Sequence, residues 1–155
     1  MVYLLIQIGA DRYALETAGM IAVLPRLRLK QIPQAAAGIA GVFDYHGRPV
    51  PVVDLTAMAL GRASEASLST RLVVVRYRCP DGQHQLLGLL AEKATETARY
   101  ENRDFQDPGV AADGAAYLGP VVHDARGIVQ RVEVAQLLTP EVRESLWRQA
   151  GEALG

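Results

Sequence analysis

Short runs of hydrophobic residues recur along the whole chain, separated by clusters of turn-forming residues. The runs are rich in branched and aromatic side chains, which are typical of β-strands. Pro25 closes one run because it lacks a backbone donor, and Pro80-Asp81-Gly82 supplies a tight turn between two others. This punctuation favours an all-β barrel class over alternating strand–helix units. The predicted strands include Val2–Ile8, Tyr13–Leu15, Met20–Leu24, Leu72–Tyr77, Gln85–Leu90, Leu118–His123 and Gly127–Glu133.

One segment near the end of the chain carries helix signals instead. In Thr139-Pro140-Glu141, the threonine can accept a backbone N–H, the proline suits the first helical position, and the glutamate favours the positive end of the helix dipole. Val142, Leu146 and Ala150 then fall on one face. The sequence therefore predicts a C-terminal helix over residues 139–152 that docks on the body through this stripe.

The segment Gly38–Leu60 has the most detailed pattern. An apolar strand runs into the turn His46-Gly47-Arg48, and a second apolar strand follows and ends at Asp54. Asp54 is then placed to cap a short helix over Leu55–Leu60, and Gly61 would end that helix. The carboxylate is thus predicted to act as a cap and not as a catalytic acid.

Length and composition set the broad class of the protein. The chain has 155 residues, which is one domain of ordinary size with room for two small lobes and a substantial core. Half of the residues are hydrophobic and about a fifth are charged, as in soluble globular proteins. Two stretches are predicted as connections: Arg62–Thr70 is small and polar, and Glu101–Ala116 is rich in Asp, Gly, Pro and Ala.

The net charge and the cysteine content limit which partners and which cellular compartment the protein can have. A formal net charge of −1 argues against a surface for nucleic acid. The single cysteine, Cys79, excludes an intramolecular disulfide and fits a reducing compartment. No apolar run is long enough for a membrane span, and Met1–Ile6 is interpreted as a strand, not a signal peptide. A cytoplasmic location without direct membrane insertion is expected.

The titratable residues show no recognised catalytic or metal-binding spacing. His46, His84 and His123 do not fall at i, i+3 or i, i+4, and no second cysteine completes a zinc set. Nucleophile-elbow, metalloprotease and phosphate-loop motifs are absent. No catalytic residue, metal ligand or cofactor is therefore predicted. A small-ligand-binding barrel or an unrecognised enzyme stays open as the alternative. A concave pocket with convergent polar groups would indicate such a function.

A basic segment follows the third predicted strand. Arg26, Arg28 and Lys30 alternate with Leu27 and Leu29. Two interpretations stay open: the charges guard a strand edge against unwanted pairing, or they form a basic strip that faces a partner.

Several motifs, taken together in their order, resemble those of the CheW family of chemotaxis coupling proteins. Gly41-Val42 with Gly47 is similar to the family's G-V-x-x-x-x-G turn, and Pro51–Leu55 is similar to its P-V-V-D-L strand end. The likeness covers nearly the whole chain. The other matching segments are Leu4–Gly9, Tyr13–Leu15, Leu72–Val75, Leu87–Leu90, Tyr117–Gly119 and Val129–Leu138.

The resemblance implies two SH3-like five-stranded β-barrels packed on each other, with a C-terminal helix and no catalysis. It implies an adaptor that couples the cytoplasmic tip of a methyl-accepting chemoreceptor to a CheA-type histidine kinase at membrane-associated receptor arrays. In this family the receptor tip lies near an apolar groove between the lobes, and both lobes contribute kinase contacts. The expected division of the single domain 1–155 is 10–66 for the first barrel, 1–9 with 67–138 for the second, and 139–152 for the helix.

Two positions depart from the family pattern. The family usually has N-[LI]-R-G at the turn, where His46 replaces the arginine, and V-x-E-[VI] after the tyrosine step, where Ala22 replaces the glutamate. Because both charges are absent together, a lone buried charge is avoided. The departures favour a divergent array, such as a surface-sensing or pilus-control system, over flagellar chemotaxis. The candidate partner-binding residues, for the receptor groove or the kinase interface, are Met20, Ala22, Val42, Tyr45, His46 and Arg48.

Overall fold

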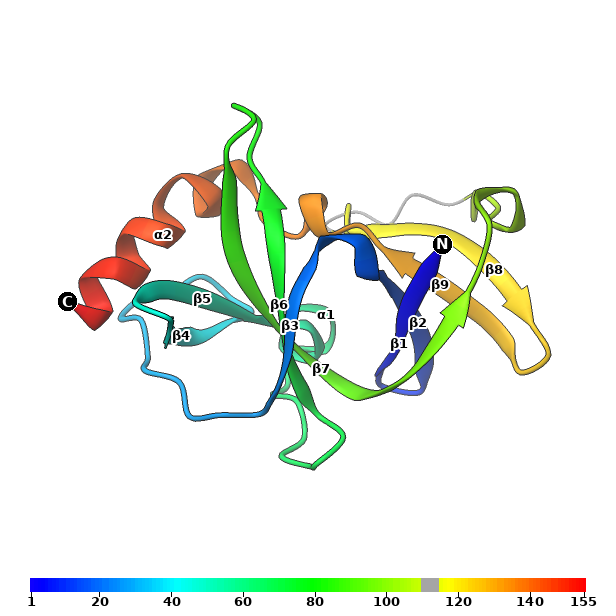
Figure 1. Cartoon of the computed structure of the whole chain (residues 1–155), viewed down its shortest axis with the longest axis horizontal. Helices are drawn as coiled ribbons and strands as arrows, with labels where there is room; N and C mark the ends of the chain where they lie inside the picture. The colour runs from blue at the N-terminus through cyan, green and yellow to red at the C-terminus, as the bar shows by residue number, and fades with distance from the viewer. Residues whose placement is uncertain (110–114) are drawn as a thin grey trace.

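Two five-stranded sheets share one long strand. The computed structural model describes residues 1–109 and 115–155. Its strands are β1 (Val2–Ile8), β2 (Asp11–Glu16), β3 (Met20–Pro25), β4 (Ile39–Tyr45), β5 (Arg48–Asp54), β6 (Arg71–Arg78), β7 (His84–Arg99), β8 (Leu118–Asp124) and β9 (Gly127–Val132). The first half of β7 pairs with β5 and β6, and its second half pairs with β1. Figure 1 shows β7 running from one half of the molecule into the other.

The strand pairings define two lobes. Lobe 1 consists of β3, β4, β5, β6 and the first half of β7, in the order β3-β6-β7-β5-β4. Lobe 2 consists of β1, β2, β8, β9 and the second half of β7, in the order β7-β1-β2-β9-β8. Most pairs are antiparallel, but β5 with β7 and β2 with β9 are parallel. The predicted class, two five-stranded β lobes with a C-terminal helix, is confirmed.

The lobe boundaries differ from the expected division. β2 falls within the expected first barrel, 10–66, but it pairs with β1 and β9 of lobe 2. β6 and the first half of β7 fall within the expected second barrel, 67–138, but they pair with β3 and β5 of lobe 1. The physical reason is local: only Gly9-Ala10 separates β1 from β2, so the two strands close a hairpin. The parallel pairs join strands that are distant in sequence, which no local pattern reveals.

Three hydrophobic clusters hold the fold together. One lies within lobe 1 and includes Phe43, Val50 and Leu72. A second lies within lobe 2 around Tyr3. The largest contains buried residues of β1 together with residues of β6, β7 and the C-terminal helix. The two lobes therefore share a core, in addition to the covalent continuity of β7.

The C-terminal helix α2 (Pro140–Leu154) forms as predicted and extends two residues beyond 152. The side chain of Thr139 accepts a hydrogen bond from the backbone N–H of Val142, and Pro140 occupies the first turn. Leu146 is buried in the shared core, Val142 is partly buried there, and the Nε1–H of Trp147 donates to the carbonyl of Leu86 at 2.8 Å. The predicted docking is confirmed, and Figure 1 shows α2 beside β4 and β5.

The short helix α1 (Leu55–Leu60) also follows the predicted signals, and three 3-10 turns accompany it in the described part of the chain. Asp54 caps α1 by accepting from the N–H groups of Thr56 and Ala57, and Gly61 ends the helix in the left-handed region at φ +75°. A single 3-10 turn, η3 (Val134–Gln136), follows β9. Two further 3-10 turns are η1 (Thr17–Gly19) and η2 (Asn102–Asp104).

The turns and loops between the strands lie broadly where the sequence predicts them. The predicted turn at Pro80-Asp81-Gly82 joins β6 and β7 as a hairpin, but β7 continues well beyond the predicted end at Leu90. The last two predicted strands, β8 and β9, also pair as a hairpin. Within the expected loop Glu101–Ala116, residues 110–114 lie outside the described part of the chain. Across the described segments, neither helix combines the length and the apolar character that crossing a membrane requires.

Candidate partner-binding site

The turn between β4 and β5 is a fixed, exposed tip. A carboxylate oxygen of Asp44 accepts a hydrogen bond from the N–H of Gly47 at 2.6 Å, which closes the turn. His46 and Gly47 both adopt positive φ values, +51° and +85°. The ring of Tyr45 lies edge-on to His46, with 4.5 Å between the ring centroids, and also contacts Phe43. The tip therefore presents an aromatic surface whose backbone is held in place.

A short strap, residues 26–30, runs beside this hairpin. Lys30 forms two backbone hydrogen bonds with Val42, at 2.8 and 2.9 Å. The close approach depends on Gly41, because a Cβ at this position would lie 2.5 Å from the carbonyl oxygen of Lys30. Gly41 is also at φ +151°. This glycine therefore permits the strap to pack against the edge of β4.

The strap, the hairpin and the end of α2 enclose an open groove of about 530 Å³, here named the hairpin groove. Its surface is mainly apolar, and charged groups stand at its rim. The residues that line it are Leu24, Leu27, Arg28, Lys30, Val42, Phe43, Asp44, Tyr45, His46 and Leu154.

The structure brings together only part of the predicted site. Val42, Tyr45 and His46 line the hairpin groove, although Val42 is fully buried and forms part of its floor. Ala22 lies on β3 and packs against the lobe 1 cluster that Tyr45 also contacts. Arg48 is exposed at the start of β5, outside the lining of the groove.

Met20 lies elsewhere, at the opposite end of β3. It pairs with Val75 and follows Gly19, and both of these residues line a second groove of about 510 Å³. This interlobe groove runs between β6 of lobe 1 and the end of β9 in lobe 2. Its lining residues are Glu16, Ala18, Gly19, Val75, Arg76, Arg78, His84, Arg131, Val132, Glu133, Val134 and Ala135.

Sequence reasoning missed several residues of the hairpin groove. Leu27 and Leu154 were not selected, because one belongs to an irregular strap and the other to a helix more than a hundred residues away. The available signal was the alternation of Leu27 and Leu29 with basic residues, which was interpreted for its charges and not for its leucines.

The buried carboxylates have structural partners. Asp54 accepts four hydrogen bonds, two from α1 and two from the N–H and hydroxyl of Ser64. Glu92 accepts from the hydroxyl of Thr56 at 2.6 Å and lies 3.6 Å from the guanidinium of Arg62. Both acids tie the segment around α1 to the sheet, and the predicted capping role of Asp54 is confirmed.

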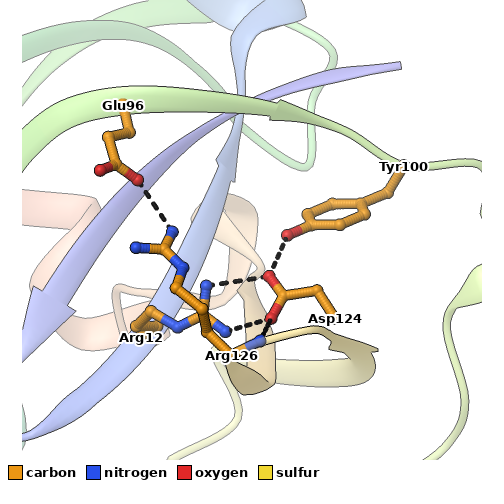
Figure 2. A network of polar contacts seen from close by, with 5 residues as sticks. All are labelled: Arg12, Glu96, Tyr100, Asp124 and Arg126. Atoms are coloured by element: carbon orange, nitrogen blue, oxygen red, sulfur yellow. Dashed lines mark hydrogen bonds and ion pairs between the residues drawn. The ribbon is translucent and has the colours of Figure 1, made fainter.

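A polar network in lobe 2 centres on Asp124 (Figure 2). The guanidinium of Arg12 donates two hydrogen bonds to this carboxylate, Tyr100 donates one from its hydroxyl, and Arg126 donates its backbone N–H. The hydrogen bonds from Arg12 hold the pKa of Asp124 well below its usual range. Burial, followed by the hydrogen bond to Asp124, raises the pKa of Tyr100. Arg126 also pairs with Glu96 at 2.8 Å. These charges are satisfied within the fold.

Two further kinds of reactive group in the described part of the chain are potential metal ligands and the single thiol. Within the described ranges, no three His, Cys, Asp or Glu side chains gather where they could hold a metal ion. Burial, followed by the nearby Asp81, raises the pKa of the Cys79 thiol. A raised pKa lowers the thiolate fraction, so Cys79 is a poor nucleophile.

Comparison with known proteins agrees with the two-lobed architecture. The chain matches the CheW-like domain family over residues 2–142. Its fold is similar to that of the scaffolding protein TtCheW from Thermoanaerobacter tengcongensis, with a TM-score of 0.78 and 17% sequence identity over 91% of this chain and 89% of that chain. No protein with a curated description matches the chain.

Proposed function

We propose that this chain, which belongs to the CheW-like domain family, couples a chemoreceptor tip to a CheA-type histidine kinase as a non-catalytic adaptor. The observation that carries the proposal is the family match over residues 2–142, together with the two-lobed fold that the chain shares with a CheW scaffolding protein. CheW proteins are scaffolds in chemotactic signal transduction. The structural roles of Asp54 and Glu92 support a function without catalysis. The proposed place of action is the cytoplasmic side of a membrane, at a receptor array.

Each groove is assigned to one class of partner in this proposal. The interlobe groove takes the receptor tip, because both lobes line it and Met20 lies beside it. The hairpin groove takes the kinase, through Tyr45, His46 and the neighbouring Arg48. The apolar lining of the hairpin groove supports this role, since the buried centre of a protein interface is usually apolar.

The proposed system is a divergent array, such as a surface-sensing or pilus-control system. The support is the joint replacement of a Glu/Arg pair by Ala22 and His46. Ala22 packs against the lobe 1 cluster, where an unpaired carboxylate would be costly to bury. A partner that normally hydrogen-bonds to the Glu and Arg side chains would find neither of them on this chain. One of its own polar groups would then stay unpaired in the interface, at a cost of about 1–3 kcal/mol of binding free energy.

The test is a pull-down of the receptor cytoplasmic tip and the kinase encoded beside this chain, with the same fragments of a flagellar system in parallel. The protein is expected to capture the cognate partners and to capture the flagellar ones at least about tenfold less well. The double variant Ala22→Glu with His46→Arg should shift the preference towards the flagellar partners. Equal capture of both sets, unaffected by the double variant, would contradict the divergent array. Failure to capture either kinase or either receptor would contradict the adaptor function itself.

A further inference from the structure

The strap beside the hairpin groove carries three cations that the fold does not use. Arg26, Arg28 and Lys30 are exposed, and none has a carboxylate within ion-pair distance in residues 1–109 and 115–155. Apart from the backbone bridge at Lys30, the strap has no strand partner among the described residues, so these side chains do not protect an edge paired within that part of the chain. Of the two interpretations of this basic segment, the guarded strand edge therefore has little support.

Nearby acids do not balance these charges. Asp44, the acidic residue that lines the groove, already closes the hairpin turn through Gly47. Residues 20–91 hold eight Lys or Arg and four Asp or Glu, and one of those four acids is the buried cap Asp54. The rest of the chain holds eight basic and thirteen acidic residues. The near-neutral total thus hides the positive charge of lobe 1. The helix α2, which packs on β4 and β5, adds two basic and three acidic residues and so removes only one unit of that charge.

The apolar part of the groove lies directly beside these cations. Leu27 projects from the strap between Arg26 and Arg28 and is 36% exposed. Leu24, Tyr45 and Leu154 line the same groove from β3, the hairpin and α2. Apolar surface and excess positive charge therefore occupy one site, which is drawn from four separate segments.

We propose that the hairpin groove binds an acidic protein segment whose apolar side chains enter the groove while its carboxylates pair with Arg26, Arg28 and Lys30. The inference deepens the proposed adaptor function, on which it rests, by naming the chemistry of the partner at this site. Carboxylates suit the site because arginine pairs with them in two parallel hydrogen bonds. The positive charge of the strap also attracts an acidic partner before contact, which speeds association, and it repels basic competitors.

The shape of the site favours a protein segment over an anionic membrane. Leu27 is partly exposed and could touch a membrane, but the rest of the apolar surface lies in a recess with Val42 and Phe43 at its floor, which a flat lipid surface would not fill. A chain segment can place single side chains in such a recess and keep its carboxylates at the rim.

The experiment uses two synthetic amphipathic peptides with the same leucines on one face. One peptide has glutamates on its other face, and its twin has lysines at those positions. Affinity for the full chain is measured by fluorescence anisotropy at low salt and at about 0.5 M salt, where surface charges are screened. The acidic peptide is expected to bind at least about tenfold more tightly than its twin at low salt, and high salt should remove most of that difference.

A matched pair of variants locates the site. The triple variant Arg26→Glu, Arg28→Glu, Lys30→Glu should lose at least about tenfold in affinity for the acidic peptide. The control triple variant Lys93→Glu, Arg99→Glu, Arg103→Glu makes the same change in net charge at exposed positions of lobe 2. The control should bind as the parent chain does. Circular dichroism would establish that both variants are folded.

Four outcomes would overturn the inference. Equal affinity for the two peptides would contradict the acidic chemistry, and equal loss in both triple variants would contradict the location. Stronger binding to phosphatidylserine vesicles than to the acidic peptide, abolished by the strap variant, would identify a membrane surface instead. Sedimentation of the chain alone as an oligomer that only the strap variant dissociates would identify a second copy as the occupant. If the acidic peptide does not bind, the pull-down of kinase and receptor is unaffected. The acidic-segment proposal and the adaptor proposal can therefore fail separately.

Discussion

The two lobes have similar numbers of basic residues but use them differently. In lobe 2, Arg12 pairs with Asp124, Arg126 with Glu96, and Arg131 with Glu133, whereas Lys93, Arg99 and Arg103 have no ion pair in the described part of the chain. In lobe 1, the paired arginine is Arg62, with Glu92. Among the other cations of lobe 1, Arg28 and Lys30 line the hairpin groove, Arg26 and Arg48 lie next to residues that line it, and Arg76 and Arg78 line the interlobe groove. None of these six is ion-paired in the described part of the chain.

This difference separates charges that hold the fold from charges that are available to a partner. An arginine engaged in two hydrogen bonds with a partly buried carboxylate stabilises its own lobe. An exposed cation without a partner contributes little to stability, so its position is free to serve recognition. Lobe 2 therefore uses half of its basic residues in ion pairs within the fold, whereas lobe 1 leaves most of its cations unpaired. The variants below test that distinction, beginning with the largest expected effect.

The largest effect is expected where α2 closes lobe 1. Leu146 is 1% exposed and lies in the core that the two lobes share. Leu146→Ala should lower the free energy of unfolding by about 2–4 kcal/mol, because it leaves a cavity in a packed core. Urea denaturation measures the loss, with Arg148→Ala on the exposed face of the same helix as control. A loss below about 1 kcal/mol, equal to that of the control, would mean that α2 is a loosely attached tail.

The next largest loss of stability is expected at Asp54, and Asp44 in the same lobe serves as the comparison. Asp54→Ala removes the acceptor of four hydrogen bonds at a buried cap and should cost about 2–3 kcal/mol of unfolding free energy. Asp44→Ala removes one hydrogen bond in an exposed turn and should cost about 0.5–1 kcal/mol. Thermal and urea unfolding of both variants provide the measurement. Equal losses would show that the segment around α1 does not depend on its buried cap.

A smaller, pH-dependent effect is expected in lobe 2. Arg12→Ala breaks the pair with Asp124 and should cost about 1–2 kcal/mol of unfolding free energy at neutral pH. Because Arg12 lowers the pKa of Asp124 in the folded state, the stabilisation is present above the ordinary aspartate value of about 3.9. It is lost as the pH falls below that value, since the unfolded state then binds the proton more readily.

The measurement is urea denaturation of the parent chain and Arg12→Ala between neutral and acidic pH. The difference between the two stabilities should shrink as the solution becomes more acidic. Glu96→Gln, which removes the fully surface pair with Arg126, is the control and should cost less than about 0.5 kcal/mol. A difference between parent and Arg12→Ala that does not change with pH would show that the Asp124 pair is not its source.

Local chemistry predicted most elements of the fold. Asp54 and Gly61 bound α1, and Thr139 with Pro140 starts α2, because capping depends on residues within one turn of the helix. The hairpin about Pro80-Asp81-Gly82 was equally local. These features could be predicted because the residues that determine them are neighbours in sequence.

Long-range features could not be predicted in the same way. The division into lobes depends on the parallel pairs β2–β9 and β5–β7, whose strands are separated by many residues. The hairpin groove joins Leu27 to Leu154, so no window of sequence contains it. Of the candidate residues, Val42, Tyr45 and His46 lie together in the hairpin groove because they belong to one hairpin, while Met20 lies beside the other groove, and their role in partner binding stays a prediction.

The smallest effect on stability is expected at Arg28, on the rim of the hairpin groove. Its guanidinium has no acidic partner in residues 1–109 or 115–155, so Arg28→Ala removes no ion pair that holds lobe 1 together. The free energy of unfolding should change by less than about 0.5 kcal/mol at neutral pH, in contrast to Arg12→Ala in lobe 2. Urea denaturation of both variants under the same conditions makes the comparison direct. A loss at Arg28 equal to that at Arg12 would remove the distinction between the lobes, because the strap would then be part of the structural framework. A stable Arg28→Ala variant that captures the kinase several-fold less well would place the function of this arginine in recognition.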